Sequence, residues 1–368
     1  MIQEAGIQLD LKMPSKDVSR EMEVFYNPVM KSNRDLSIAL LLALDKQKLK
    51  IALPLCGSGI RAYRFLSELP SEMIETLFVN DVRKGFPTEF QKGLGRNNLG
   101  PLSSQVEMFS QDANQFLLGQ MGFDYIDIDP FGSPNPFLSA AVARINRGGV
   151  LAVTATDTGA LAGRYIKAGL RKYWARGLRC SLKHELGLRI LIRKVQLQGV
   201  QFGKALIPIL SYHKNHYYRV FFVSSNGKQR CDEILKQHQY VLYDPKTLTR
   251  KVSPYNVWEG KSPGSYQIAG PLWAGDLHDA SLVTKMCKEN IFPSEHSFLT
   301  SICEEAQNEN VVGFIDTHEL ASRYGLENPK MKLLLSIQGV WRTQFGGSVV
   351  KTNLSAQEIA IKLKTMKE

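Results

Sequence analysis

Alternation between short apolar segments and amphipathic helical patterns most constrains how this chain can fold. Each apolar segment is four to seven residues long and ends in a polar or glycine-containing turn. This spacing predicts a doubly wound α/β domain with a mostly parallel sheet. The five predicted strands are residues 50–55, 76–79, 106–110, 123–129 and 149–155.

Two further apolar segments, residues 204–213 and 217–225, predict an antiparallel hairpin because only a short turn around Lys214-Asn215 separates them. A hairpin that closes the sheet is typical of the class I methyltransferase fold, which uses S-adenosylmethionine. Dinucleotide-binding enzymes share the strand–helix alternation but are not expected to have this hairpin. The sequence therefore favours the methyltransferase version of the fold.

The fourth predicted strand runs directly into Asp129-Pro130-Phe131-Gly132. In open α/β sheets, ligands bind beyond the carboxyl ends of the strands, so Asp129 lies where chemistry is expected. Pro130 has no N–H, which leaves its carbonyl free as an acceptor, and Phe131 adds a flat apolar face. Together these groups suit a planar base that carries an exocyclic amine. The alternative is structural, because Asp-Pro is also a common turn opener.

A glycine loop follows the first predicted strand, with Gly57 and Gly59 before an amphipathic helix. Glycines at this position let the backbone approach a ligand closely and leave helix N–H groups open to it. Asp81 follows about 20 residues later, where a carboxylate commonly holds ribose hydroxyls. Arg34 lies at the start of an earlier predicted helix, where the helix dipole disfavours a cation. We therefore expect this arginine to have a ligand or an acidic partner. A surface arginine is the plainer alternative.

Basic residues are concentrated between residues 161 and 251, with 19 Lys and Arg against 4 Asp and Glu, in a chain of formal net charge +11. A local block of this kind predicts a polyanionic partner, most simply nucleic acid. A solvated basic face without a partner is the alternative. The candidate RNA-binding residues are Arg171, Lys172, Arg176 and Arg179.

Composition excludes several classes of protein. No apolar run reaches the ~18–20 residues that span a bilayer, and the N-terminus lacks the basic and apolar regions of a secretory signal. We therefore expect a cytoplasmic protein with no membrane partner. The five cysteines form no Cys-x-x-Cys pair, which argues against a disulfide framework and a cysteine-rich zinc site, so no metal is expected.

The composition changes near residue 262, after a linker-like stretch rich in Gly, Ser and Pro. We predict a methyltransferase domain with an N-terminal extension over residues 1–265. Helical patterns followed by two short strands predict a smaller α+β domain over residues 266–368. That domain shows no catalytic constellation, so we expect it to position the substrate, and no obligate protein partner is indicated.

Seven short motifs follow one another along the chain: Phe25-Tyr-Asn-Pro, Asn33-Arg34-Asp35, Gly59-Ile-Arg61, Asn80-Asp81, Asp112-Ala113-Asn114, Asp129-Pro-Phe-Gly-Ser-Pro and Thr154-Ala-Thr-Asp157. In this order they resemble the motifs of the archaeal and eukaryotic tRNA (guanine(26)-N(2))-dimethyltransferases. Cys56-Gly57-Ser58 departs from the Ser-Ala-Thr, or similar, that members of this family often have. The cysteine pairs that some members carry near the position of Tyr243 are also absent.

The resemblance implies a role for individual residues. Asp129 is expected to be the catalytic carboxylate, and Phe25 and Phe131 to stack on either side of the guanine. The residues expected to contact S-adenosylmethionine by this resemblance are Arg34, Arg61, Asp81, Asp112 and Ala113.

The predicted reaction is two successive methyl transfers to the 2-amino group of guanosine 26 in tRNA. Asp129 would accept one N–H and take its proton, while the Pro130 carbonyl would hold the other. One alternative is an amino-methyltransferase that acts on adenine, cytosine or another guanine in rRNA or DNA. A second alternative, from another class, is a catalytically inactive tRNA-binding protein.

Overall fold

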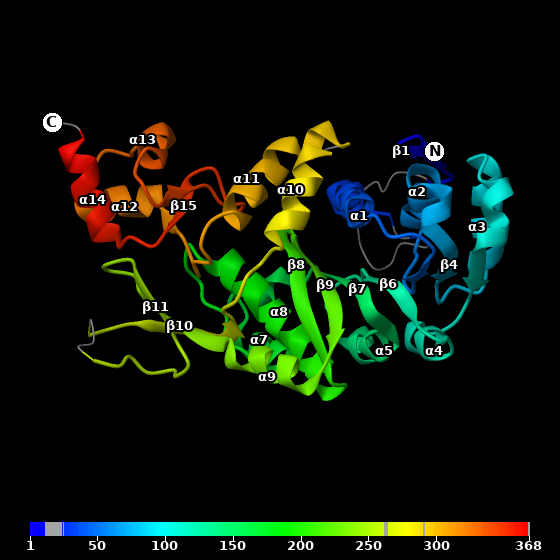
Figure 1. The fold of residues 1–368 in the computed structure, drawn as a ribbon, viewed down its shortest axis with the longest axis horizontal. Coiled ribbons are helices and arrows are strands. Elements are labelled where there is room, and N and C mark those ends of the chain that lie inside the picture. The colour runs from blue at the N-terminus through cyan, green and yellow to red at the C-terminus, as the bar shows by residue number, and fades with distance from the viewer. Residues whose placement is uncertain (12–23, 25, 261–263, 290, 367–368) are drawn as a thin grey trace.

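A seven-stranded sheet with the order β5-β4-β3-β6-β7-β9-β8 forms the centre of the molecule (Figure 1). The computed structural model describes residues 1–11, 24, 26–260, 264–289 and 291–366. Strands β3 to β7 are parallel, and β9 pairs antiparallel with both β7 and β8. The prediction of a mostly parallel sheet closed by a hairpin is confirmed. The strands are β3 (Leu49–Leu53), β4 (Ile74–Asn80), β5 (Val106–Phe109), β6 (Phe123–Ile128), β7 (Ile145–Ala155), β8 (Lys204–Lys214) and β9 (Tyr217–Asn226).

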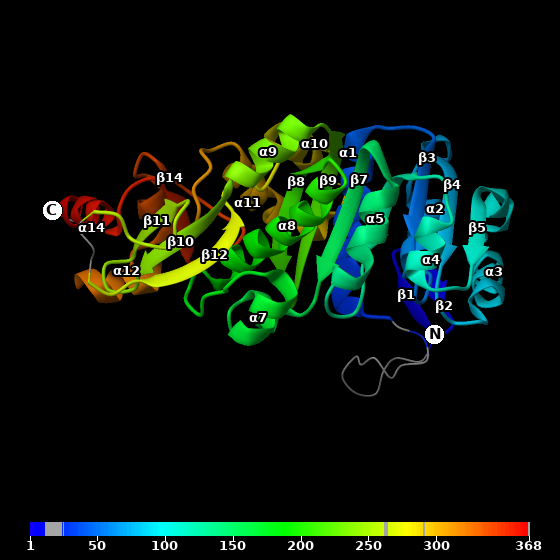
Figure 2. The ribbon, with the colours of Figure 1, turned by 90° about the horizontal axis from the view of Figure 1, so that it is seen from below.

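Helices cover both faces of this sheet, because the central strands are apolar on both sides. Figure 2 shows α4, α5 and α8 in front of the strands and α1 behind them. Two apolar cores result, one on each face. On one face are α1 (Lys31–Leu44), α2 (Ile60–Glu68) and α3 (Phe86–Arg96); on the other are α4 (Ala113–Leu118), α5 (Leu138–Arg144) and α8 (Lys183–Gln201).

Shorter elements complete this part of the chain. An N-terminal hairpin, β1 (Ile2–Glu4) and β2 (Ile7–Leu9), packs against α2 and α3. Between β7 and α8 lie α6 (Thr158–Leu161) and α7 (Ile166–Tyr173), and α9 (Lys228–Lys236) follows β9. The loop between β7 and α8 therefore carries the predicted basic surface to the carboxyl ends of the strands.

The C-terminal third extends the molecule away from the N-terminus, beyond β8 (Figure 1). It contains two small antiparallel sheets with the orders β11-β10-β12 and β13-β15-β14. The strands are β10 (His238–Asp244), β11 (Thr249–Ser253), β12 (Gln267–Trp273), β13 (Ile315–Asp316), β14 (Val340–Trp341) and β15 (Val349–Thr352). The helices are α10 (Ala280–Lys288), α11 (His296–Ala306), α12 (Thr317–Tyr324), α13 (Met331–Leu335) and α14 (Ala356–Thr365).

The outer edge of β8, the last strand of the central sheet, is covered by polar groups from the C-terminal third. Gln344 behaves like a peptide group: its Nε2 donates to the Ser211 carbonyl at 3.0 Å and its Oε1 accepts from the His213 N–H at 3.2 Å. The backbone N–H of Asp279 donates to the Ile209 carbonyl at 2.9 Å. These contacts satisfy groups that an edge strand otherwise leaves open to another chain.

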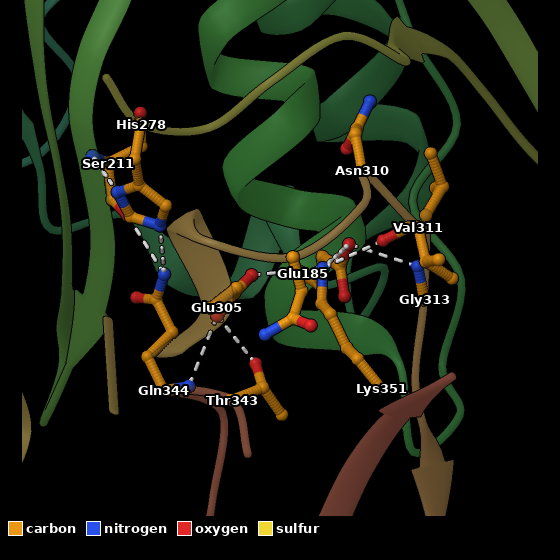
Figure 3. A network of polar contacts seen from close by, with 12 residues as sticks. Glu185, Ser211, His278, Glu305, Asn310, Val311, Gly313, Thr343, Gln344 and Lys351 are labelled. Carbon is orange, nitrogen blue, oxygen red and sulfur yellow. Dashed lines mark hydrogen bonds and ion pairs between the residues drawn. The ribbon is translucent and has the colours of Figure 1, made fainter. Parts of the chain in front are cut away.

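A buried ionic network joins the same regions (Figure 3). Lys351 on β15 lies 3.0 Å from Glu185 on α8 and 2.9 Å from Glu305 on α11. Arg189 adds a second cation, with its Nε 2.9 Å from Glu185. Burial opposes ionisation of Glu305, but Lys351, His278 and Thr343 together outweigh it and lower the pKa of Glu305 to about 2. Because every one of these charges is paired, the network holds α8, α11 and β15 in one arrangement.

The predicted domain boundary at residue 265 falls between two strands of one sheet, because β12 pairs with β10 across it. The boundary stays a prediction. Over the described ranges, every helix is too short or too polar to cross a membrane.

Candidate active site

A cavity of about 700 Å³ opens at the carboxyl ends of β3, β6 and β7. Three segments form its walls: the start of α1 with the residues before it, the glycine loop after β3, and the loop after β6. Asp157 and Lys172, from the segments after β7, and His216 and Tyr217, at the turn between β8 and β9, also line the cavity. This is the position at which open α/β sheets bind their ligands.

Two hydrogen bonds with Thr156, the residue after β7, hold the loop after β6 in place. The Gly132 N–H donates to Thr156 Oγ1 at 2.7 Å, and the Thr156 N–H donates to the Gly132 carbonyl at 2.9 Å. Gly132 has a φ of 92°, which a side chain would disfavour. As a result Asp129, Pro130 and Phe131 all line the cavity, and Phe131 is 45% exposed. The structure therefore brings together the three groups that the sequence predicted for a base with an exocyclic amine.

Arg61, in the first turn of α2, connects the loop after β6 with the interior of the domain. Its Nη2 contacts Asp129 Oδ2 and donates to Asn33 Oδ1 at 2.8 Å. Its Nη1 donates to Ser37 Oγ at 3.0 Å and lies 3.3 Å from Asp127. Burial opposes the charge, but Asp127 and Asp129 outweigh it and raise the pKa of Arg61. Arg61 is thus a permanent cation that holds the orientation of Asp129.

Asp127 and Arg219 form a buried pair beneath this contact that sequence reasoning missed. Arg219 on β9 donates to Asp127 Oδ1 at 2.8 Å and to Oδ2 at 2.7 Å. Tyr125 also donates to Asp127 at 2.8 Å. Burial alone would raise the pKa of Asp127, but Arg219 and Arg61 lower it. The signal in the sequence was an acid, Asp127, within the apolar end of β6 and a single base, Arg219, on β9.

Asp81 lies against the glycine loop but not in the cavity lining, and its predicted role in holding ribose hydroxyls stays a prediction. The Gly57 N–H donates to Asp81 Oδ2 at 2.8 Å, and Gly57 has a φ of 57°. Arg83 donates to Asp81 Oδ1 at 3.0 Å and to the Gly57 carbonyl at 2.7 Å. At Gly59, with φ +79°, a Cβ would meet Tyr63 Cε2 at 2.8 Å. Gly57 lines the cavity, and Asp81 is tied to it by a direct hydrogen bond.

Arg34 lines the cavity and has an acidic partner that the sequence did not reveal. Its Nε donates to Glu4 Oε1 at 2.7 Å, and its Nη2 contacts Glu4 Oε2 and the Asn27 carbonyl, the latter at 3.2 Å. Arg64 and Tyr26 also contact Glu4, each at 3.0 Å. Burial opposes ionisation of Glu4, but Arg34 lowers its pKa. The N-terminal hairpin therefore anchors one wall of the cavity through Glu4.

Asp112 and Ala113 do not join the cavity lining. Asp112 caps α4, since its Oδ1 accepts from the N–H groups of Asn114 at 2.9 Å and Gln115 at 3.2 Å. Ala113 is buried at the start of the same helix. Both follow β5, two strands away from β3. Their role in cofactor binding stays a prediction, and Phe25 lies outside the described residues.

The predicted RNA-binding residues Arg171, Lys172, Arg176 and Arg179 are all exposed, on α7 and the segment that follows it. Lys172 also lines the cavity. The basic surface therefore adjoins the site. The part of the chain that the structure describes has no group of three or more His, Cys, Asp or Glu that could hold a metal ion.

Comparisons with known proteins find similarity over almost the whole chain. A family model described as N2,N2-dimethylguanosine tRNA methyltransferase matches residues 6–364. The tRNA (guanine(26)-N(2)/guanine(27)-N(2))-dimethyltransferase of Aquifex aeolicus is 36% identical over 381 residues, which cover 100% of this chain and 96% of that protein. The tRNA (guanine(26)-N(2))-dimethyltransferase of Thermococcus kodakarensis is 34% identical, over 94% of this chain and 92% of that protein.

A solved structure is similar over the same extent. The complex of Trm1 from Pyrococcus horikoshii with S-adenosyl-L-methionine superposes with a TM-score of 0.83 and 30% sequence identity, and the match covers 98% of each chain. The similarity therefore includes the central sheet and the C-terminal third together.

Proposed function

This chain belongs to the N2,N2-dimethylguanosine tRNA methyltransferase family, and from that premise we propose how its own residues carry out the reaction. It has a class I S-adenosylmethionine-dependent methyltransferase fold with an additional C-terminal domain. Its activity is the dimethylation of the 2-amino group of guanosine 26 in tRNA, with S-adenosylmethionine as the cofactor.

One observation carries the assignment of the site: Asp129, Pro130 and Phe131 line the same cavity as the glycine loop. The first three groups suit a base with an exocyclic amine, and the loop suits the cofactor. Methyl transfer needs both ligands in one space, with the amine in line with the methyl group. A single cavity lined by both sets of residues supports this arrangement.

Asp129 acts as the base in this account. The guanine 2-amino group is a poor nucleophile because its lone pair is delocalised into the ring. Asp129 accepts one N–H of the amine and takes its proton as the new bond forms, while the Pro130 carbonyl accepts the other N–H. Arg61 keeps the Asp129 carboxylate oriented through its contact with Oδ2.

A second set of residues at the cavity fits S-adenosylmethionine. Gly57 presents backbone without a side chain, and Asp81 beside it offers a carboxylate for ribose hydroxyls. Arg34 and Arg61 bring two guanidinium groups to the lining, which suit the carboxylate of the methionine part. Asp112 and Ala113 would complete the site from the end of β5. The cofactor, when bound, supplies a methyl group on a positively charged sulfur.

The base is held by stacking. Phe131 and Phe25 would lie on either face of the guanine, each contributing ~1–3 kcal/mol by analogy with single-strand platforms. The nucleotide must leave its stack in the tRNA to reach the cavity. The exposed arginines on and after α7 would hold the neighbouring phosphates.

The C-terminal third positions the tRNA in this proposal. The division into residues 1–265 and 266–368 separates the catalytic part from that positioning part. The network around Lys351 supports the proposal, because it holds the two parts in a fixed relation. A cytoplasmic location stays a prediction.

The experiment that tests this function measures transfer of labelled methyl groups to a tRNA transcript and to the same transcript with guanosine 26 replaced by adenosine. We expect label on the first transcript and none on the second. Label on both would contradict the site on the tRNA. Label on neither would contradict the activity and favour a tRNA-binding protein.

A further inference from the structure

Besides Asp127 and Asp129, a third carboxylate lines the cavity, beside the loop that carries Asp129. Asp157 follows β7, and Lys172 on α7 places its Nζ 3.2 Å from Asp157 Oδ2. Both residues line the cavity. The side chain of Asp157 is 15% exposed and that of Lys172 is 48% exposed. An acceptor and a donor thus lie next to each other at the edge of the space that holds the base.

The fold sets this pair against the loop after β6. Strands β6 and β7 are neighbours, with Ile128 opposite Val153, so the loops that follow them adjoin. The two hydrogen bonds between Gly132 and Thr156 join the loops directly.

Further hydrogen bonds fix the positions of Asp157 and Lys172. Tyr173 OH contacts Asp157 Oδ1 and lies 3.1 Å from Ser133 Oγ in the loop after β6. Asn135 Nδ2 donates to the Lys172 carbonyl at 2.7 Å. Because Tyr173 occupies Oδ1, Oδ2 is the oxygen that remains beside Lys172.

The edge of guanine has a matching order of groups. Next to the 2-amino group comes the N1–H, a donor, and then O6, an acceptor. Flipped bases are read by hydrogen bonds to this Watson–Crick edge. If Asp129 and Pro130 accept from the amine, the neighbouring N1–H needs an acceptor and O6 needs a donor.

We propose that Asp157 and Lys172 select guanine, with Asp157 Oδ2 accepting the N1–H and Lys172 donating to O6. This inference rests on the proposed function, because it takes the 2-amino group to lie at Asp129. A purine with a lone pair at N1 and an amine at C6 would face the carboxylate with an acceptor and the ammonium with donors. Such a mismatch leaves the polar groups of the site unpaired.

The other explanation is structural: the pair would only anchor α7 to the end of β7. The two explanations differ in what they predict for base selectivity. A merely structural pair would affect all bases equally, since it would act on the shape of the whole site. If the pair instead bonds the base directly, its removal would change transfer to each base differently, according to the donors and acceptors on the edge of that base.

2,6-Diaminopurine separates the two explanations. It keeps the 2-amino group that is methylated but has a lone pair at N1 and an amine at C6. The test measures kcat/KM for labelled methyl transfer to tRNA that carries guanosine or 2,6-diaminopurine riboside at position 26. By the size of comparable base-reading contacts, we expect the wild-type enzyme to prefer guanosine by roughly 10- to 100-fold.

In Asp157→Asn, Tyr173 can still donate to the amide oxygen, which leaves an NH₂ group to donate to the N1 of diaminopurine. We expect transfer to guanosine to fall and the preference to approach unity. Lys172→Gln, at a half-exposed position, tests the O6 contact without removing the contact between Asp157 and Tyr173, and its preference for guanosine should fall as well. Lys167→Gln, at another exposed position on α7, is the control and should leave the preference unchanged.

Different results would contradict this proposal and the proposed function on which it rests. Equal transfer to both bases by the wild-type enzyme would overturn the proposal while leaving the activity intact. Asp157→Asn and Lys172→Gln variants that slow both substrates by the same factor would also overturn it and establish the structural explanation. No transfer to guanosine by the wild-type enzyme would instead be a failure of the proposed function.

Discussion

Arg61 and Asp129 form an ion pair in the wall of the cavity, in which the guanidinium Nη2 contacts the carboxylate Oδ2. The same guanidinium lies 3.3 Å from Asp127, so it connects the loop after β6 with a carboxylate inside the domain. Asp127 is in turn bound by Arg219 on β9. The chain of contacts therefore runs from β9 through β6 and α2 to Asp129, the carboxylate that we propose as the base.

Arg61→Lys is expected to weaken S-adenosylmethionine binding and to slow methyl transfer. A lysine keeps the charge but cannot contact Ser37, Asn33 and both aspartates at once. Lost charge-assisted hydrogen bonds of ~1.5–3 kcal/mol correspond to roughly 10- to 100-fold weaker binding. Calorimetric titration with the cofactor measures this, and Arg96→Lys, on α3, is the control. Unchanged affinity in Arg61→Lys would remove Arg61 from the cofactor site.

Arg219→Met is expected to destabilise the protein. Asp127 would lose both of its short bonds to Arg219 and would keep only Arg61 and Tyr125 as partners. Loss of one partner of a buried ion pair commonly costs ~3–5 kcal/mol. Urea unfolding measures the free energy of unfolding, with the exposed Arg147→Met as the matched control. If the two variants were equally stable, the pair would not be important for the fold.

The stability of the protein is expected to fall as pH decreases from 7 to 4. Burial lowers the pKa of His278 to about 4, whereas an ordinary histidine has a pKa of ~6.5. The unfolded chain therefore takes up this proton at a higher pH than the folded chain does. The contribution of neutral His278 is complete above about pH 6.5 and is lost as pH falls toward 4.

His278→Gln tests this pH dependence. Between pH 7 and pH 4 the variant should lose about 3 kcal/mol less of its free energy of unfolding than the wild type. Urea unfolding across that pH range gives the comparison, and the exposed His318→Gln should follow the wild type. If the free energy of unfolding fell equally with pH in the wild type and in His278→Gln, the assignment of this pH dependence to His278 would be contradicted.

The fold could be read from the sequence because its signals are local. The apolar strands, the turn at Lys214-Asn215 and the glycines at 57 and 59 each specify their own conformation. Asp129 and Phe131 could be found because they follow a strand directly. Their position relative to the sheet then follows from topology alone.

The remaining parts of the site depend on contacts between distant segments. Glu4 is thirty residues from Arg34 in the chain, and Arg219 is 92 residues from Asp127. No periodicity or motif links such pairs, so the sequence predicted a ligand or an acidic partner for Arg34 but could not identify that partner as Glu4. Asp112 is expected in the site only by resemblance; its side chain caps α4, and its role in cofactor binding stays a prediction.

Arg176→Gln with Arg179→Gln is expected to weaken tRNA binding with little effect on kcat. Both side chains are exposed on the surface beside the cavity, where phosphates would lie. Each lost phosphate contact should reduce the slope of log K against log salt concentration by about 0.7–0.9. Binding measured over a series of salt concentrations gives this slope. Lys92→Gln, exposed on α3 near the other edge of the sheet, should leave the slope unchanged.

The central claim is that Asp129 takes the proton from the guanine amine, and Asp129→Asn tests it most directly. Single-turnover transfer of labelled methyl groups to tRNA should fall by ~10²–10⁴-fold, the usual contribution of a general base. Binding of S-adenosylmethionine should persist, and the exposed Glu75→Gln should behave like the wild type. Full transfer activity in Asp129→Asn, with the cofactor bound, would contradict the account.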